Sequence, residues 1–434
     1  MKPIKTFTTD AKNNIGKEIT LKGWVDEIRD IGKLVFLILK DQKSKIQIIA
    51  KQGIVDVKII ETIRHITKES SVEITGTPKQ AKNAFNGVEL IPKEISVISK
   101  AYPNLPIPTD ERATITLSKR LDYRYLDLRN QKTLAIFKIQ AQIMQSFRQF
   151  MISNDFYEFN SPGIISSSSE GGADLFSLLY YQKEAFLAQS PQLYKQMAAI
   201  GGMERVFTIS RIWRAEVSNT IKHLSESRQM DAEACFFDWS DAINLLCEVF
   251  CYIVKDINKK CKTELEILGV ELNEISNNEI PKIEYTEAIK ILQKNKIDIK
   301  FGDDLGSKAE KKICQIYENK PIIVKKWPSD LRAFYSMPDE KDKKFSKSYD
   351  LLFGGMELAS GAERIHIPEL LEQKLKEKQM DIENFKSYIK SFRYGAPPHS
   401  GWSIGLERFT MTLCNLSNIR EATLFPRDTE RIGP

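Results

Sequence analysis

The sequence predicts an α+β protein with a small N-terminal β-barrel and a larger domain of mixed strands and helices. Three observations lead to this prediction. Short alternating segments fill the first 100 residues, a proline-rich stretch follows them, and a long helical pattern begins near residue 133. A chain of 434 residues is also longer than one ordinary hydrophobic core requires, which favours more than one domain.

Five strands are expected in the barrel, because β-branched residues recur there in short, often alternating runs. A helix is expected over Val55–Ile66, where apolar residues recur at helical spacing between the third and fourth strands. Five strands with a helix after the third are typical of the OB-fold, a barrel that often binds single-stranded nucleic acid. The expected strands are Glu18–Val25, Leu34–Leu39, Lys45–Ala50, Ser71–Gly76 and Val88–Ile95.

The remaining chain divides at a stiff segment, since Ala101–Thr109 contains three prolines. A long helix is expected over Thr133–Asn154, and mixed strands and helices follow it. The expected organisation is an OB-fold domain over 1–100, a linker or hinge over 101–132 and the larger domain over 133–434, with a helical insertion at about 240–330.

The net charge of +6 is distributed unevenly along the chain. Residues 1–105 contain 18 basic and 12 acidic side chains, whereas the rest of the chain contains 46 of each. A basic domain beside a neutral one suggests a polyanion-binding module attached to a catalytic body. The alternative is a lysine-rich surface that only keeps the domain soluble, and charge alone does not separate the two.

Several classes of protein do not fit the sequence. It contains no run of eighteen apolar residues, and its N-terminus lacks an apolar signal core, so we expect no membrane span and a cytoplasmic location. The six cysteines form no CxxC pair, which favours buried thiols over a zinc site. Neither a Rossmann nor a P-loop glycine pattern is present.

Three separated segments combine charged residues with glycine or proline, namely Phe156–Ile164, Arg211–Glu233 and Gly401–Met411. In the second segment, Arg214 and Glu216 are two apart on an expected strand and therefore share a face. The arginine could contact a phosphate while the glutamate accepts from a base amine. Taken singly, the first segment also fits an ordinary strand and turn, and the second also fits a surface hairpin.

Together, in this order and at this spacing, the three segments resemble motifs 1, 2 and 3 of the class II aminoacyl-tRNA synthetases. The resemblance extends over nearly the whole chain. It implies an antiparallel catalytic sheet flanked by helices, ATP bound in a bent form, and a homodimer built partly on motif 1.

Further segments are similar to the archaeal type of aspartyl-tRNA synthetase, within class IIb. The implied reaction joins L-aspartate to tRNA-Asp, with or without tRNA-Asn, and converts ATP to AMP and diphosphate. The segments are Ser166–Phe176, Phe186–Met197, Met356–His366, the stretch YGAPPHSGW before motif 3 and the terminal NIREATLFPRDTERIGP.

The resemblance also implies roles for individual residues. Lys195 and Arg364 would hold the side-chain carboxylate of aspartate, and Arg214 and Arg408 would be catalytic, because positioning and charge stabilisation can supply this chemistry. Mg²⁺ would bind at Glu357 and Ser360. The implied aspartate site is Glu170, Gln192, Lys195, Arg214, Asp231, Ser360 and Arg364. The implied ATP site is Arg214, Ala215, Glu216, Lys222, His223, Leu224, Glu357, Gly405, Leu406, Glu407 and Arg408.

In the barrel, the resemblance implies that Phe36 stacks on an anticodon base and that Gln47 and Glu89 bond to it. The alternative interpretation of Phe36 is a core residue of the barrel. The chain departs from many relatives at Ser227 and Arg228, where an aromatic residue is common. The sequence therefore leaves open which residue stacks on adenine, and Arg228 is a candidate through its guanidinium group.

Three rival functions remain at this stage. An asparaginyl-tRNA synthetase is disfavoured by Lys195, and a tRNA-independent asparagine synthetase is disfavoured by the attached barrel. The third rival is a non-catalytic tRNA-binding paralogue. The presence of Arg214, Glu216, Glu357, Arg364 and Arg408 argues against it.

Overall fold

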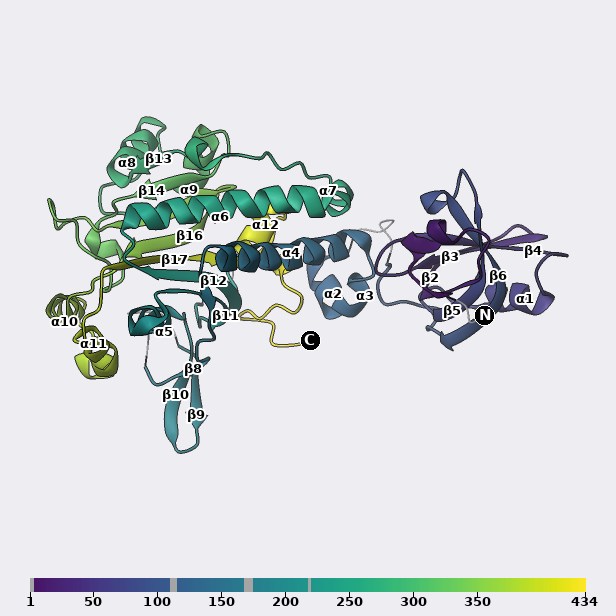
Figure 1. Cartoon of the computed structure of the whole chain (residues 1–434), viewed down its shortest axis with the longest axis horizontal. Coiled ribbons are helices and arrows are strands. Elements are labelled where there is room, and N and C mark those ends of the chain that lie inside the picture. Colours follow the sequence, from purple (N-terminus) through teal and green to yellow (C-terminus); the bar gives the residue numbers. More distant parts are fainter. Residues whose placement is uncertain (1–3, 110–114, 168–174, 218–219) are drawn as a thin grey trace. The chain divides into compact units, whose positions relative to one another are not determined.

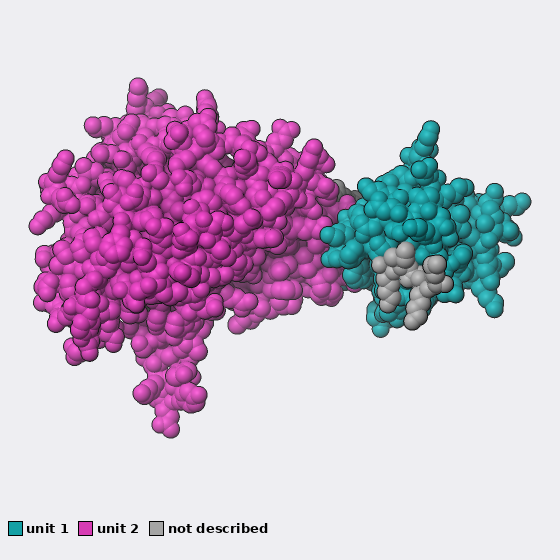
Figure 2. Space-filling view, viewed as in Figure 1, with its two compact units in different colours: residues 1–108 teal, residues 109–434 magenta. Residues whose placement is uncertain are grey.

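The computed structural model describes residues 4–109, 115–167, 175–217 and 220–434 (Figure 1). The chain forms two compact units, residues 1–108 and 109–434, which are coloured separately in Figure 2. Among the helices of the described residues, none is both long enough and apolar enough to cross a membrane.

The N-terminal unit is a closed barrel, which confirms the predicted OB-fold. Its strands follow the order β1-β2-β3-β4-β6-β5, and pairing of β2 with β5 closes the sheet. Helix α1 (Val57–His65) follows β4, and the Asp56 side chain caps its N-terminus. The strands are β1 (Ile4–Lys5), β2 (Ile19–Asp30), β3 (Leu34–Lys40), β4 (Lys45–Lys51), β5 (Ser71–Gln80) and β6 (Val88–Ser99), and the short helices are η1 (Thr8–Asn14) and η2 (Phe85–Gly87).

The second unit is built on an eight-stranded sheet of order β13-β14-β15-β16-β17-β12-β11-β7. Its neighbouring strands are antiparallel except for the parallel pairs β7–β11 and β13–β14 at the two edges. This arrangement confirms the expected antiparallel sheet. The strands are β7 (Tyr157–Glu158), β11 (Arg205–Trp213), β12 (Glu226–Cys235), β13 (Lys282–Glu284), β14 (Ile322–Lys325), β15 (Ser348–Phe353), β16 (Met356–Glu363) and β17 (His399–Gly405).

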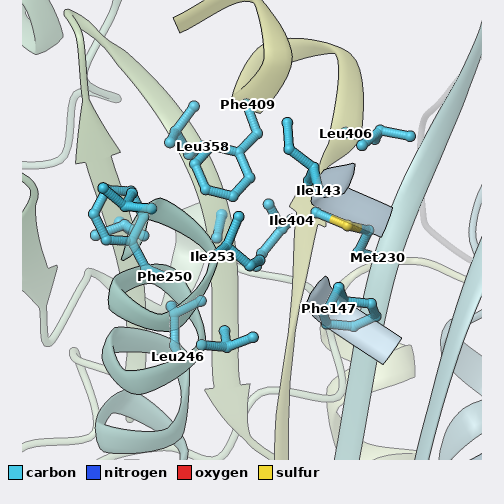
Figure 3. Close-up of a cluster of buried hydrophobic side chains, with 14 of the residues drawn as sticks. Ile143, Phe147, Met230, Leu246, Phe250, Ile253, Leu358, Ile404, Leu406 and Phe409 are labelled. Carbon is cyan, nitrogen blue, oxygen red and sulfur yellow. The ribbon is translucent and has the colours of Figure 1, made fainter. Parts of the chain in front are cut away.

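Most of the helical side chains in the hydrophobic core against this sheet come from α4 (Gln131–Ser153), α6 (Trp239–Lys260) and α12 (Leu406–Leu413). Figure 1 shows α4 and α6 running side by side along the sheet. Figure 3 shows how their side chains meet those of the strands. The labelled contributors are Ile143, Phe147, Met230, Leu246, Phe250, Ile253, Leu358, Ile404, Leu406 and Phe409.

The rest of the second unit surrounds this core. A small sheet is formed by β8 (Ile164–Ile165), β10 (Lys183–Leu187) and β9 (Ser177–Tyr180). Residues 240–330 do more than form a helical insertion, because α6 packs on the main sheet and β13 and β14 extend it. The further helices are α2 (Leu117–Asp122), α3 (Arg124–Asp127), α5 (Gln192–Ala198), η3 (Ala199–Met203), α7 (Lys262–Leu268), η4 (Asn277–Glu279), α8 (Tyr285–Lys294), α9 (Ser307–Ile316), η5 (Ser329–Leu331), α10 (Pro368–Glu377), η6 (Ile382–Phe385), α11 (Lys386–Phe392) and η7 (Ile419–Ala422).

Strand β12 illustrates how the fold creates a second, polar face. Met230, Ala232 and Ala234 belong to the core beneath the helices. Because side chains alternate along a strand, Asp231 and Glu233 point to the opposite face. Both carboxylates are nonetheless almost fully buried. Other elements therefore cover this face and enclose charged groups there.

Candidate active site

A cavity of about 420 Å³ lies over the polar face of the sheet. Residues from β11, β12, β16, β17 and the segment 331–336 line it. It brings together most of the residues that the sequence predicts for aspartate and ATP. These are Gln192, Arg214, Glu216, Lys222, His223, Leu224, Asp231, Glu357, Ser360, Arg364, Gly405, Glu407 and Arg408.

Three predicted residues are placed differently, and a fourth is not described. Lys195 is completely buried and does not line the cavity, because it lies behind Asp231. Leu406 belongs to the hydrophobic core, and Ala215 is half-buried outside the lining. Glu170 lies outside the described residues.

One end of the cavity is closed by a buried cluster of two cations and two anions. Lys195 Nζ donates to Asp231 Oδ1 over 2.8 Å and to the carbonyl oxygen of Trp402 over 3.1 Å. Arg364 donates to Glu233 from both Nε, over 2.9 Å, and Nη2, over 3.2 Å. Buried charges are tolerated when each is paired and hydrogen-bonded in this way.

Burial and the neighbouring charges both shift the pKa values of the carboxylates in this cluster. Burial alone would raise the pKa of Glu233, but Arg364 and Lys195 together hold the pKa of Glu233 below its usual range. Burial raises the pKa of Asp231 more than Lys195 lowers it. Arg364 Nη1 donates no hydrogen bond to any residue that the structure describes. That amino group is therefore available to an anionic ligand in the cavity.

Gly401 allows this cluster to form. A Cβ atom at this position would lie 2.2 Å from Glu233 Oε2 and 2.2 Å from the carbonyl oxygen of Ala232. The missing side chain at Gly401 therefore leaves space on the polar face of the sheet. The carboxylate of Glu233 occupies this space at Gly401, whereas at Gly405 the nearest atoms to an added Cβ belong to the Arg408 side chain, at 3.7–3.8 Å.

The opposite end of the cavity is rich in cations. Arg408 Nη1 donates to the carbonyl oxygen of Glu357 over 3.2 Å, and Lys222 Nζ donates to that of Gly355 over 3.2 Å. Burial lowers the pKa of His223; Glu216 opposes this shift, and the positive charges of Arg408, Lys222 and Arg214 add to it. Cations converging on one open space favour a ligand with several negative charges, such as a polyphosphate.

A β-bulge places Glu357 and Ser360 on the same face of β16. Residues three apart on a regular strand would face opposite sides. Here Leu352 pairs with Glu357 whereas Leu351 pairs with Ala359, so Leu358 is an extra residue in the ladder. Both side chains consequently line the cavity. Spacing alone could not have predicted this, because the bulge is not visible in the sequence.

Comparison with known families identifies the architecture. Residues 116–429 match the family model described as tRNA synthetases class II (D, K and N). The chain belongs to the class II tRNA synthetases. Residues 19–98 also match the OB-fold nucleic acid binding domain.

Several relatives of this synthetase resemble it over their full length. The aspartate–tRNA(Asp/Asn) ligase of Archaeoglobus fulgidus is 40% identical over 99% of this chain and 100% of its own. That of Methanosarcina barkeri is 39% identical over 99% of this chain and 98% of its own. These similarities show that the resemblance to the archaeal aspartate–tRNA(Asp/Asn) ligases extends over the full length of the chain.

Solved structures from both specificities share the fold. Asparaginyl-tRNA synthetase from Pyrococcus horikoshii, complexed with asparaginyl-adenylate, matches with a TM-score of 0.94 and 30% identity over 99% of both chains. Aspartyl-tRNA synthetase from Entamoeba histolytica matches with a TM-score of 0.87 and 32% identity, over 99% of this chain and 93% of its own. Fold similarity alone therefore does not choose between aspartate and asparagine.

Sequence reasoning missed one charged residue of this synthetase's cavity, Arg332. Its Nη1 donates to Asp350 over 3.0 Å and to Ser360 Oγ over 3.2 Å, and its guanidinium lies 4.1 Å from the centre of the Trp327 ring. Burial raises the pKa of Asp350 to about 6 although Arg332 opposes the rise. Arg332 lies outside the three motifs, so only its position in the fold reveals it.

The structure does not support Arg228 as the residue that stacks on adenine. Ser227 lines the cavity of this synthetase, but Arg228 does not, because adjacent residues of β12 face opposite sides. The backbone N–H of Arg228 donates to Glu407 Oε2 over 2.9 Å. Burial raises the pKa of Glu407 to about 7, so its protonated form is favoured in the fold.

In the barrel unit, the predicted anticodon residues lie on a surface-facing side of the sheet. Phe36 is half-buried between the fully buried Val35 and Leu37, and it is absent from the barrel core. Gln47 is the neighbour of Glu89 across β4 and β6, and its Nε2 donates to Glu89 Oε2 over 3.4 Å. The interpretation of Phe36 as barrel core is therefore wrong.

Proposed function

We propose that this synthetase is an aspartate–tRNA ligase of protein biosynthesis. It would activate L-aspartate with ATP and transfer the aspartyl group to the 3′ end of tRNA-Asp, and it would also accept tRNA-Asn if its anticodon reading is broad. Full-length similarity to the archaeal aspartate–tRNA(Asp/Asn) ligases supports this proposal. The structural observation that supports it most is the buried guanidinium of Arg364, which lines the cavity.

Arg364 would discriminate between a carboxylate and an amide. Its side chain is 4% exposed, lines the closed end of the cavity and keeps Nη1 without a described partner. A carboxylate accepts a charge-assisted hydrogen bond there, which is roughly twice as strong as a neutral one. Lys195 would act indirectly, because it neutralises Asp231 and Glu233 and so prevents them from repelling the substrate.

In the first step, an α-carboxylate oxygen of aspartate forms a bond to the α-phosphorus of ATP, and the bond from that phosphorus to the bridging oxygen of the diphosphate breaks. The products are aspartyl-adenylate and diphosphate. Arg214 would hold the reacting carboxylate and the α-phosphate, whereas His223 and Arg408 would hold the outer phosphates. In the second step, a hydroxyl oxygen of the terminal ribose forms an ester bond to the aspartyl carbonyl carbon. The bond from that carbon to the phosphate oxygen breaks, AMP leaves with the electron pair, and the hydroxyl proton is released.

Mg²⁺ fits the residues at the cationic end. Glu357 offers a carboxylate and Ser360 a hydroxyl on one face of β16. Among the described residues, no three His, Cys, Asp or Glu side chains are grouped to hold a metal. One carboxylate and one hydroxyl suit Mg²⁺, because this ion binds one or two protein carboxylates and completes its coordination shell with waters and phosphates. When bound, it would neutralise charge on the diphosphate that leaves.

We further propose that the protein works as a homodimer in the cytoplasm. Strand β7 is an edge of the main sheet, and Tyr157 on it is 63% exposed. Ile152, just before it at the end of α4, is 59% exposed. Edge strands with exposed apolar residues are usually covered. Sedimentation velocity of the wild type and of Tyr157→Asp would detect the dimer and its loss.

A second candidate, asparagine–tRNA ligase, is favoured by the high similarity to the Pyrococcus horikoshii structure. The test is ATP–diphosphate exchange with aspartate and with asparagine, followed by charging of tRNA-Asp and tRNA-Asn. The proposal expects exchange with aspartate alone and charging of tRNA-Asp. Exchange with asparagine alone would overturn it in favour of the second candidate, and exchange with neither would exclude both.

A further inference from the structure

A chain of buried hydrogen bonds connects β17 and α11 to Gln192 at the closed end of the cavity. His399 Nδ1 lies 2.9 Å from the carbonyl oxygen of Pro397, and His399 Nε2 lies 2.9 Å from Gln196 Nε2. Gln196 Oε1 accepts from Gln192 Nε2 over 3.0 Å and from the Tyr388 hydroxyl over 2.9 Å. Gln196 and His399 are completely buried, and Gln192 is 5% exposed.

The chemistry of the groups fixes the direction of every bond in this chain. A carbonyl oxygen can only accept, so His399 must carry its proton on Nδ1. Burial lowers the pKa of His399 to about 4, so the ring is neutral near neutral pH and Nε2 is an acceptor. Gln196 must then present its NH₂ group to His399 and its carbonyl oxygen to Gln192.

The same reasoning determines which atom of Gln192 faces the ligand. Gln192 uses Nε2 as a donor to Gln196, so its carbonyl oxygen Oε1 remains. That oxygen receives no hydrogen bond from any residue in the described part of the chain, and Gln192 lines the cavity. The cavity therefore contains a fixed acceptor rather than an amide that is free to rotate.

We propose that His399 is a positioning residue: through Gln196 it orients the Gln192 amide so that Oε1 accepts a hydrogen bond from the α-ammonium group of the amino acid substrate. This inference rests on the proposed function, since it assumes that an amino acid occupies the closed end. An ammonium group has donors only and would be rejected by an amide turned the other way.

The experiment compares His399→Phe and Gln196→Met, which break the chain, with Tyr388→Phe as the matched control. Tyr388→Phe also removes one buried hydrogen bond to Gln196. It retains His399, which still determines the orientation of the Gln196 amide. The first two variants should raise the KM for aspartate about tenfold in ATP–diphosphate exchange, the typical effect of a lost charge-assisted hydrogen bond. The KM for ATP, and both constants in Tyr388→Phe, should change by less than about twofold.

Succinate, which is aspartate without the α-amino group, separates this role from a purely structural one. Its inhibition constant should be the same in wild type, His399→Phe and Gln196→Met. A double-mutant cycle gives a second test: Gln192→Ala should add little to the loss in His399→Phe, because both act on one contact. Equal weakening of succinate and aspartate, or full additivity in the cycle, would overturn the inference.

The two levels of failure are distinguishable. If the proposed function is wrong, the wild type will show no aspartate-dependent exchange. If only the inference is wrong, wild-type exchange will be normal and the His399 and Gln196 variants will match Tyr388→Phe. Thermal unfolding identifies a variant that fails to fold, and the other chain-breaking variant then decides the outcome.

Discussion

Arg364 and Glu233 form a two-point ion pair in which Nε and Nη2 of the guanidinium donate to the two carboxylate oxygens over 2.9 and 3.2 Å. The side chain of Glu233 is fully buried, and that of Arg364 is 4% exposed. This fork geometry fixes the guanidinium plane and leaves Nη1 directed elsewhere. Binding of an anionic ligand at this end therefore depends on a fixed guanidinium as well as on a positive charge.

Arg364→Lys tests this dependence, because lysine keeps the charge but cannot bond at two points. We expect kcat/KM for aspartate in ATP–diphosphate exchange to fall. The loss of transition-state stabilisation should be about 2–5 kcal/mol, the range for disrupting a buried charge pair. The KM for ATP should stay within about twofold. Lys386→Met, which removes a charge exposed on α11, is the control. Near wild-type exchange in Arg364→Lys would refute the role of Arg364.

Glu357→Gln should weaken the use of magnesium, because a neutral amide is a poorer ligand for Mg²⁺ than a carboxylate. We expect the Mg²⁺ concentration for half-maximal exchange to rise about tenfold, which corresponds to about 1.4 kcal/mol. Glu340→Gln, at a carboxylate with an 82% exposed side chain, serves as the control. Superimposable Mg²⁺ titrations of the wild type and Glu357→Gln would show that this assignment is wrong.

Glu407 should make stability depend on pH. Its pKa is raised by burial from 4.5 to about 7, so between these values the folded state binds a proton that the unfolded state has lost. The free energy of unfolding should therefore decrease as pH rises through this interval. Residue 407 cannot ionise in Glu407→Gln. The free energy of unfolding of this variant should therefore decrease by about 2–3 kcal/mol less than that of the wild type.

The measurement for Glu407 is urea denaturation of the wild type and Glu407→Gln at pH 5 and pH 8. Other titrating groups contribute equally to both proteins and cancel in the comparison. The amide oxygen of the variant can still accept from the Arg228 N–H, so that hydrogen bond is retained. An equal loss of stability in the two proteins would contradict the prediction.

Phe36→Ala should separate tRNA recognition from catalysis. We expect kcat/KM for tRNA to fall by a factor that corresponds to about 1–3 kcal/mol. This is the typical free energy of stacking one base on an aromatic ring. Exchange without tRNA should be unchanged, and Gln47→Ala should act in the same direction. Leu37→Ala is the contrast, because Leu37 belongs to the barrel core and its truncation should reduce stability. Equal damage by Phe36→Ala to exchange and charging would refute the anticodon role.

Local patterns predicted the elements of the fold well, because each pattern reports a nearby physical cause. The five barrel strands and the helix α1 were expected within a few residues of their observed bounds, since alternation and helical spacing are read from neighbours. The long helix expected from Thr133 is α4, Gln131–Ser153. The sequence did not predict β1, because two residues are too short to form a pattern.

The site was harder to predict because its geometry depends on distant partners. Lys195 is next to Asp231 only because α5 packs under β12, and no local pattern reports its complete burial. Arg228 was a candidate for stacking on adenine, but the alternation of β12 turns Ser227 toward the cavity instead. Arg332 has its partners, Asp350 and Ser360, on two other strands.

Gly401 is also constrained by two independent obstacles during sequence evolution. A methyl group there would overlap the carboxylate of Glu233 as well as the backbone of Ala232. A mutation at 401 therefore displaces the partner of Arg364 before any other change can compensate. Conversely, shortening Glu233 first does not make room, because the backbone of Ala232 still blocks the methyl group. Neither order of single steps leads from this arrangement to a side chain at 401, so drift among descendants of this chain should leave that glycine unchanged.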